Sequence, residues 1–290
     1  MNKRVAAALI LILLAGLILA GQLATTSDEY SRYNINWNGT SDFFGLAADK
    51  PSVFSYDDLP AGSGSTLLII APGTEFGGLS RYLYEGNTVI IADQSGNANI
   101  FLEQIGSSIR VHDQPVRSTS MEYKDMGIFR GTVEGDLFGS NVTTLTFNYP
   151  GYVTGGETVA ATSHLSWVDA NKNNIPDASE PLKVYSLIAS ETISTGRVIV
   201  IADPSVFINS MLVRTHTENI QFINALLEEE LIIDQTNSAS TSGGGLCPLL
   251  GAMHRYPALG TILITILFIL THWPCKRPAG VSFSAETKVE

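Results

Sequence analysis

Gly196-Arg-Val-Ile-Val-Ile-Ala-Asp-Pro-Ser-Val-Phe-Ile-Asn209 is the stretch of sequence that decides the fold of this chain. Its apolar run, Val198 to Ala202, follows a glycine turn and is rich in β-branched residues, which is typical of a strand buried on both faces. In open α/β sheets, ligand loops usually follow the carboxyl ends of such strands. Asp203, Ser205 and Asn209 are therefore candidate ligand-loop residues. An ordinary strand exit, capped by Asp203, explains the same residues.

Outward from this stretch, further apolar runs alternate with short helical patterns. Residues 66–71 and 88–92 read as buried strands, and residues 79–85, 99–105 and 218–230 read as helices. This alternation predicts right-handed crossovers in a mostly parallel sheet, and thus an α/β fold. Asp93 and Gln94 directly follow the strand at 88–92, so they join the candidate ligand-loop residues.

The pattern changes between residues 109 and 194. Here apolar and polar residues alternate in short runs separated by Gly and Ser, as in 144–149, 158–162 and 183–189. Such alternation is typical of antiparallel strands with one exposed face. We therefore expect a β-rich insertion, or an extension of the sheet, over about 109–194.

Both ends of the chain carry long apolar runs next to basic residues. The first, within residues 1–22, follows Lys3 and Arg4, and reads as an uncleaved membrane anchor or a long signal-peptide core. The second, within 249–273, precedes Lys276 and Arg277, and reads as a transmembrane helix, with a buried core helix as the alternative. We favour two spans.

The positive-inside rule then places both termini in the cytoplasm. Residues 23–235 become one extracytoplasmic domain, residues 236–248 a flexible Ser/Thr/Gly-rich linker, and residues 274–290 a cytoplasmic tail. The formal net charge of −11 and the absence of any Lys/Arg cluster argue against a nucleic-acid partner. The cell membrane is the predicted location.

The most specific motif is Asp169-Ala-Asn-Lys-Asn-Asn-Ile-Pro-Asp-Ala-Ser-Glu180. Calcium takes about six to eight oxygen ligands, and alternate residues of a tight loop can direct theirs inward. Asn174 stands where such loops usually carry Gly, a position that Asn tolerates. A turn rich in Asn and Asp, stabilised by its own side chains, is the alternative. The predicted Ca²⁺ ligands are Asp169, Asn171, Asn173, Ile175 (through its carbonyl), Asp177 and Glu180.

Two triplets, beginning at Asn38 and Asn141, fit the N-glycosylation acceptor pattern, which also occurs frequently by chance. No phosphate-binding loop, dinucleotide-binding glycine motif or Gly-x-Ser-x-Gly elbow is present. Asp93 and Asp203 have no visible base or metal partner in the sequence, and both can be explained as caps of turns.

Several of these pieces occur in an order that resembles the DUF4350 family. They are Asn36-Trp-Asn-Gly-Thr-Ser41, Leu67-Leu-Ile-Ile-Ala-Pro72, Gly86-Asn-Thr-Val-Ile-Ile-Ala-Asp93, the Asp-x-Asn-x-Asn loop and the stretch from Gly196 to Asn209. The resemblance covers about residues 30–231. It implies a flavodoxin-like or class I amidotransferase-like sheet, similar to gliding-type transport accessory proteins, in a membrane protein of archaea or bacteria. The nucleophilic cysteine of the amidotransferase fold is missing from this domain.

These observations favour a non-catalytic, membrane-anchored binding or scaffold module. Its sheet-end loops would contact a glycan, a peptide, a partner membrane protein or transport machinery. A hydrolase or transferase that uses Asp93, Asp203 and Ser205 is the alternative, and it requires these side chains to converge in one pocket.

Overall fold

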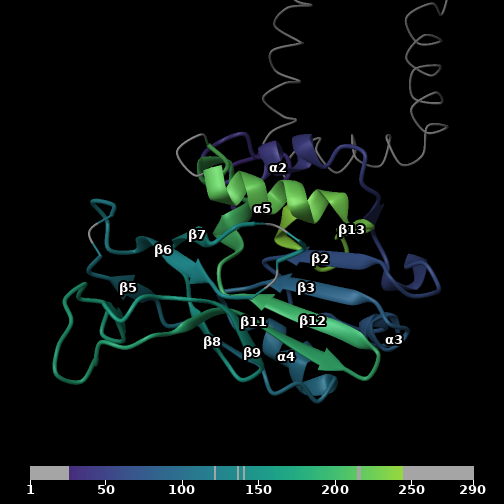
Figure 1. Ribbon diagram of the computed structural model, residues 1–290. Coiled ribbons are helices and arrows are strands. Elements are labelled where there is room, and N and C mark those ends of the chain that lie inside the picture. Colours follow the sequence, from purple (N-terminus) through teal and green to yellow (C-terminus); the bar gives the residue numbers. More distant parts are fainter. Residues whose placement is uncertain (1–25, 121, 136, 140, 214–216, 244–290) are drawn as a thin grey trace, which may run out of the picture. The chain divides into compact units, whose positions relative to one another are not determined.

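A computed structural model describes residues 26–243 of the chain, except 121, 136, 140 and 214–216 (Figure 1). Its central feature is a set of parallel strands in the order β1-β13-β2-β3-β12. In chain order they are β1 (Ser52–Val53), β2 (Thr66–Ile70), β3 (Thr88–Ala92), β12 (Gly196–Ile201) and β13 (Leu231–Asp234). The predicted parallel core around the Gly196 stretch is therefore confirmed.

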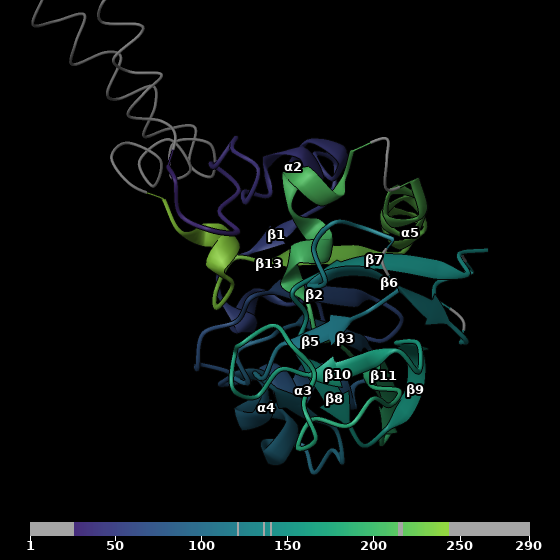
Figure 2. The same ribbon diagram turned by 90° about the vertical axis from the view of Figure 1, so that its left-hand side faces the viewer.

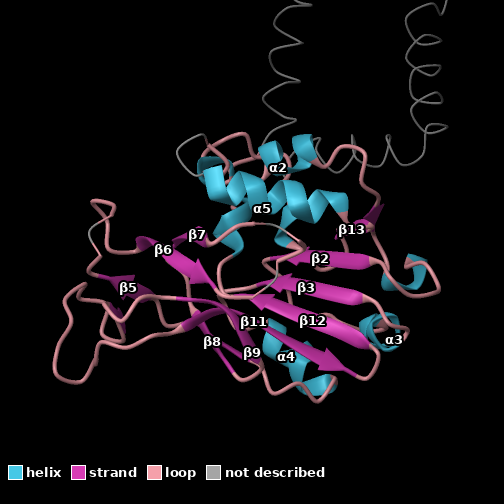
Figure 3. Ribbon diagram, viewed as in Figure 1, coloured by secondary structure: helices cyan, strands magenta, loops and turns pink. Residues whose placement is uncertain are grey.

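Helices cover both faces of this core, as the views in Figures 1 and 3 show. Ile199 and Ile201 of β12 belong to the core cluster that includes α5 (Thr217–Glu228) and α2 (Ser41–Leu46). Val198 and Val200 face the opposite cluster, with α3 (Leu79–Tyr84) and α4 (Ala98–Gln104). Because alternate residues of β12 enter two different cores, the strand is apolar throughout.

The β-rich part extends the same sheet on the far side of β12, where pairing is antiparallel. A tight turn joins β11 to β12, and strands joined by so short a turn can pair only in antiparallel fashion. The sheet is therefore mixed, and the prediction of a mostly parallel sheet is correct only for its core. The additional strands are β4 (Arg110–His112), β6 (Ile128–Val133), β7 (Thr144–Asn148), β8 (Tyr152–Thr154), β9 (Glu157–Ala161) and β11 (Ser186–Ile193).

Two short strands, β5 (Val116–Ser118) and β10 (Ser166–Val168), form a separate antiparallel ribbon, which Figure 2 shows from the side. Four short 3₁₀ segments complete the described elements. They are η1 (Tyr56–Asp58), η2 (Pro204–Phe207), η3 (Asn209–Met211) and η4 (Ala239–Thr241).

Beyond α5, the structure shows two features that the sequence analysis did not predict. Residues 231–234 form β13, a buried strand between β1 and β2 that the sequence analysis did not predict. Residues 236–243 are not a free linker, because Gly73 N–H donates to the Asn237 carbonyl at 2.7 Å and Ala239 N–H donates to the Ala71 carbonyl at 3.1 Å. The polar residues here are fixed by hydrogen bonds to the end of β2.

No helix among the described residues is long and apolar enough to span a membrane. The two predicted spans, within 1–22 and 249–273, and the tail at 274–290 lie outside the described residues.

Candidate functional site

Three buried aspartates follow or end parallel strands of the core: Asp93 after β3, Asp203 after β12 and Asp234 at the end of β13. Because these strands run in the same direction, their carboxyl ends lie at one edge of the sheet. This is the edge at which the sequence predicts ligand loops.

The carboxylate of Asp93 caps the turn after β3. Its Oδ1 accepts hydrogen bonds from the backbone N–H and the hydroxyl of Ser95, both at 2.7 Å. Its Oδ2 accepts from the N–H of Ala98, also at 2.7 Å, at the start of α4. Asp93 therefore fixes the entry to α4, as a capping carboxylate does.

Asp203 has a similar role after β12. Its Oδ1 accepts from the Ser205 N–H at 2.8 Å, and its Oδ2 accepts from the Asn148 N–H at 2.7 Å, which joins β12 to the end of β7. Burial raises the pKa of Asp203 to about 6, and these hydrogen bonds oppose that rise. Burial likewise raises the pKa of Asp234 to about 6, although two backbone N–H groups bond to its carboxylate.

Asn209 holds the N-terminal segment of the domain on this edge. Its Oδ1 accepts from the Asp42 N–H at 2.9 Å, in the first turn of α2. Its Nδ2 donates to the carbonyls of Asn34 and Asn36 and to the hydroxyl of Ser41, at 2.7 to 3.2 Å. The first turn of α2 is thus capped by a residue far along the chain, since the side chain of Thr40, which precedes the helix, makes no capping hydrogen bond.

The N-terminal segment covers Ser205 as well. The Tyr30 hydroxyl lies 3.5 Å from the Ser205 hydroxyl, and Gln94 Nε2 donates to the Tyr30 hydroxyl at 3.3 Å. Burial raises the pKa of Tyr30, so its hydroxyl stays protonated. The expectation of an open ligand loop from Asp203 to Asn209 is wrong, because the chain's own N-terminal segment occupies the space above it.

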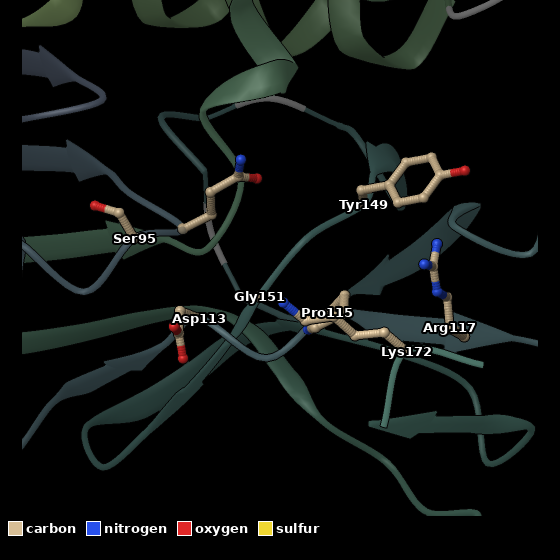
Figure 4. A pocket seen from close by; sticks show the side chains of 8 residues that line it. Ser95, Asp113, Pro115, Arg117, Tyr149, Gly151 and Lys172 are labelled. Atoms are coloured by element: carbon tan, nitrogen blue, oxygen red, sulfur yellow. The ribbon is translucent and has the colours of Figure 1, made fainter. Parts of the chain in front are cut away.

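A pocket of about 400 Å³ opens beside this covered region. Among the predicted ligand-loop residues, Gln94 lines it. The other lining residues come from the turn after β3, the region of β4 and β5, the β7–β8 turn and the Asp-rich loop (Figure 4). They are Ser95, Asp113, Pro115, Arg117, Tyr149, Gly151 and Lys172. The sequence carries no local signal for this set, since its members come from four separate segments.

Arg117 is the buried cation of the pocket. Its Nε donates to Asp169 Oδ2 at 3.3 Å, and its guanidinium carbon lies 4.4 Å from the centre of the Tyr149 ring. Figure 4 shows the guanidinium directed toward that ring. Its Nη1 is buried and has no hydrogen-bond partner among the described residues. Arg117 therefore connects the pocket to the Asp-rich loop.

Within the Asp-rich loop, side-chain oxygens accept hydrogen bonds from N–H groups further along the same loop. Asp169 Oδ1 and Asn171 Oδ1 both accept from Asn173 N–H at 3.0 Å, and Asn173 Oδ1 accepts from Ile175 N–H at 2.8 Å. Asn174 adopts a left-handed φ of +61°. A carboxylate or amide oxygen in one such bond still has acceptor capacity for a cation.

Glu180, the last of the predicted calcium ligands, also has acceptor capacity left for a cation. Its Oε1 accepts from the N–H groups of Ala170 and Asn171, whereas its buried Oε2 has no partner among the described residues. Asp177 lies at the surface, where bonds from Ser179 lower its pKa. The described residues contain no group of three or more His, Cys, Asp or Glu side chains placed to hold a metal. Calcium binding would therefore have to draw Asp177 toward Asp169 and Glu180.

The two glycosylation triplets differ in exposure. Asn141 is exposed. Asn38 is half-buried and accepts a hydrogen bond from Asn34, and its triplet partner Thr40 is fully buried and donates to the Tyr30 carbonyl. Of the two predicted sites, Asn141 is the one that the folded domain presents.

These features define the class of protein: an α/β domain with a mixed sheet, a parallel core and a pocket at the carboxyl edge of that core. Residues 32–227 match the family model "Domain of unknown function (DUF4350)". The chain belongs to this family, which confirms the family that its sequence resembles.

Comparison with curated proteins finds no match. Among solved structures, the chain is similar to one titled "mmIFT52 N-terminal domain", with a TM-score of 0.45 and 14% identity over 70% of this chain and 94% of that chain. It is also similar to part of a β-galactosidase from Bacillus circulans sp. alkalophilus, with a TM-score of 0.34 and 9% identity over 57% of this chain and 22% of that chain. No functional conclusion follows from these two similarities.

Proposed function

We propose that this protein is a non-catalytic binding or scaffold module, anchored in the cell membrane with its main domain outside the cytoplasm. Its ligand or partner binds in the pocket at the carboxyl edge of the sheet, and calcium in the Asp-rich loop stabilises the domain. The flavodoxin-like or amidotransferase-like arrangement belongs to the same proposal, supported by helices on both faces of a parallel core.

One observation carries the binding proposal. Asp93 and Asp203 accept hydrogen bonds from backbone N–H groups of their own turns and, for Asp203, of the end of β7. The neighbouring pocket is lined by Arg117, whose buried Nη1 has no partner among the described residues. A hydrolase or transferase would need Asp93, Asp203 and Ser205 free to reach a substrate. Asp203 and Ser205 are buried beneath the N-terminal segment, so we favour binding over catalysis.

The two ends of the described chain support anchoring by two spans. Arg32 N–H donates to the Ser240 carbonyl at 3.0 Å, and the Ser31 hydroxyl donates to the Ser242 carbonyl. Both segments that lead toward the predicted spans therefore leave the domain at the same place. Ile35 and Trp37, close to this point, are 70% and 65% exposed, and an exposed Trp is typical of contact with a membrane interface.

Photo-crosslinking in native membranes tests the binding proposal. A crosslinking amino acid at Asp113, which lines the pocket, is expected to capture a partner that the same amino acid at Glu85 does not capture. Glu85 is exposed at the end of α3, the helix that leads into β3, and so lies at the opposite edge of the sheet. Equal labelling from both positions, or none from either, would contradict a binding role for this pocket.

Calcium is expected to raise the melting temperature of the full-length protein in detergent. At a concentration about 100-fold above Kd the stabilisation would be about 2.7 kcal/mol, which corresponds to several degrees. Glu180→Gln should remove most of this rise, because it replaces a carboxylate whose Oε2 has no protein partner, and Glu85→Gln should keep it. The loop is only a turn if calcium has no effect, or if Glu180→Gln responds like the unmodified protein.

A further inference from the structure

We infer that the pocket recognises an acidic sugar, with Arg117 and Lys172 binding its carboxylate and the opposite wall binding its hydroxyl groups. This inference rests on the proposed function, because it takes the same pocket as the ligand site. It adds the chemical class of the ligand.

Arg117 supplies the strongest reason for a carboxylate. The residue is only 7% exposed, its guanidinium donates a hydrogen bond to Asp169, and its Nη1 has no partner among the described residues. A guanidinium has five N–H donors in a planar fork that matches the two oxygens of a carboxylate. Stacking on Tyr149 fixes the plane of the guanidinium, so its donors are oriented before a ligand binds.

Lys172 adds a second positive charge to the pocket, and its side chain is exposed. The chain as a whole carries a formal charge of −11, which repels anions in general. Arg117 is paired with Asp169, whereas Lys172 has no salt bridge among the described residues, so Lys172 is the cation that favours an anionic group at this place.

The opposite wall carries acceptors. Figure 4 shows Asp113 and Ser95 on the side of the pocket away from Arg117 and Tyr149. Gln94 adds an Oε1 that is buried and has no partner among the described residues. Carboxylate and amide oxygens accept hydrogen bonds, and sugar hydroxyl groups can donate them. A ligand with a carboxylate at one end and hydroxyl groups at the other fits a pocket that has cationic donors on one wall and hydrogen-bond acceptors on the opposite wall.

The backbone of the pocket disfavours a peptide carboxyl terminus. Such a terminus is usually held by successive free backbone N–H groups. Here the Ser95 N–H donates to Asp93, the Gly151 N–H donates to the Ala202 carbonyl at 2.9 Å, and Pro115 has no N–H. At these three positions recognition must then come from side chains, which suits a sugar.

Calorimetric titration of the full-length protein in detergent with glucuronate, glucose and acetate tests this inference. Glucuronate is expected to bind at least about tenfold more tightly than glucose, since a charge-assisted hydrogen bond contributes about that factor. It should also bind more tightly than acetate, which has the carboxylate but lacks the hydroxyl groups. Arg117→Gln should weaken glucuronate binding at least tenfold and Lys172→Gln about fivefold. Lys183→Gln, which removes an exposed cation from outside the pocket, should leave binding unchanged.

Equal binding of glucuronate and glucose, equal binding of glucuronate and acetate, or no binding of glucuronate would each overturn the inference. If Arg117→Gln does not fold, the exposed Lys172→Gln variant decides, and unchanged glucuronate affinity in that variant also overturns it. Pocket-specific crosslinks from Asp113 without glucuronate binding would reject the acidic sugar and keep the proposed function. Loss of those crosslinks is what would reject the proposed function itself.

Discussion

Gly196→Ala is expected to destabilise the domain by about 3 kcal/mol or more, because a side chain at this position meets backbone that cannot move aside. A Cβ on residue 196 would lie 2.0 Å from the Leu83 carbonyl oxygen and 2.8 Å from the Asn87 carbonyl oxygen. Leu83 belongs to α3, and Asn87 immediately precedes β3. The glycine is therefore required by the close approach of three elements at the start of β12.

Urea unfolding of the full-length protein in detergent, followed by circular dichroism, would measure this effect. Gly77→Ala is the matched control, since a Cβ there has no neighbour within 4 Å and the backbone does not have a positive φ. The expected result is a large loss of stability for Gly196→Ala and little change for Gly77→Ala. Similar unfolding midpoints for the two variants would show that the start of β12 can shift to accept a methyl group.

Asn209→Ala is expected to cost about 3 kcal/mol and to loosen the N-terminal segment. The substitution leaves the Asp42 N–H and the carbonyls of Asn34 and Asn36 without their Asn209 partner. Each buried polar group left without a partner costs about 1–3 kcal/mol, and solvent that enters the loosened segment would recover part of this. The segment should then uncover Ser205 at the end of the sheet.

Hydrogen exchange over residues 30–44 would detect this loosening, together with urea unfolding for the stability. Asn209→Asp is an informative second variant, because it keeps the acceptor for Asp42 N–H but cannot donate to the two carbonyls. Asn224→Ala, an exposed position on α5, serves as the control. Unchanged exchange over residues 30–44 in Asn209→Ala would show that other contacts hold the segment in place.

Arg117 gives the pocket and the Asp-rich loop a common residue. The carboxylate of Asp169 pairs with Arg117 and is also a predicted calcium ligand. A cation bound to Asp169 would partly neutralise the carboxylate that now balances the positive charge of Arg117. The positive charge available to an anion in the pocket would then increase, so calcium would favour anion binding.

Several local features could be predicted from the sequence because they depend on neighbouring residues. Runs of β-branched residues predicted β2, β3 and β12, and β3 has the predicted bounds of 88–92. The alternative roles of Asp93 and Asp203 as turn caps also follow from local chemistry, and their hydrogen bonds confirm them. The hydrogen bonds inside the Asp-rich loop likewise join residues close in sequence.

β13 and the chain that follows it show where local reasoning fails. Leu231–Asp234 is a very short apolar run after a helix, and the Ser-rich segment that follows it has the composition of a linker. This run becomes a core strand because it pairs with β1 and β2, two strands that lie far away in the sequence. Hydrogen bonds to the end of β2 order the residues that follow.

By itself, the sequence therefore determined the family, the parallel core around Gly196 to Asn209, and Asp93 and Asp203 at the ends of two strands. Tertiary structure alone decided that Tyr30 and Asn209 close this edge and that Arg117, Tyr149 and Lys172 meet beside it. The physical reason is distance along the chain. A strand or a capped turn is encoded by adjacent residues, whereas a covered edge or a pocket depends on contacts between segments that only the packing of the whole sheet brings together.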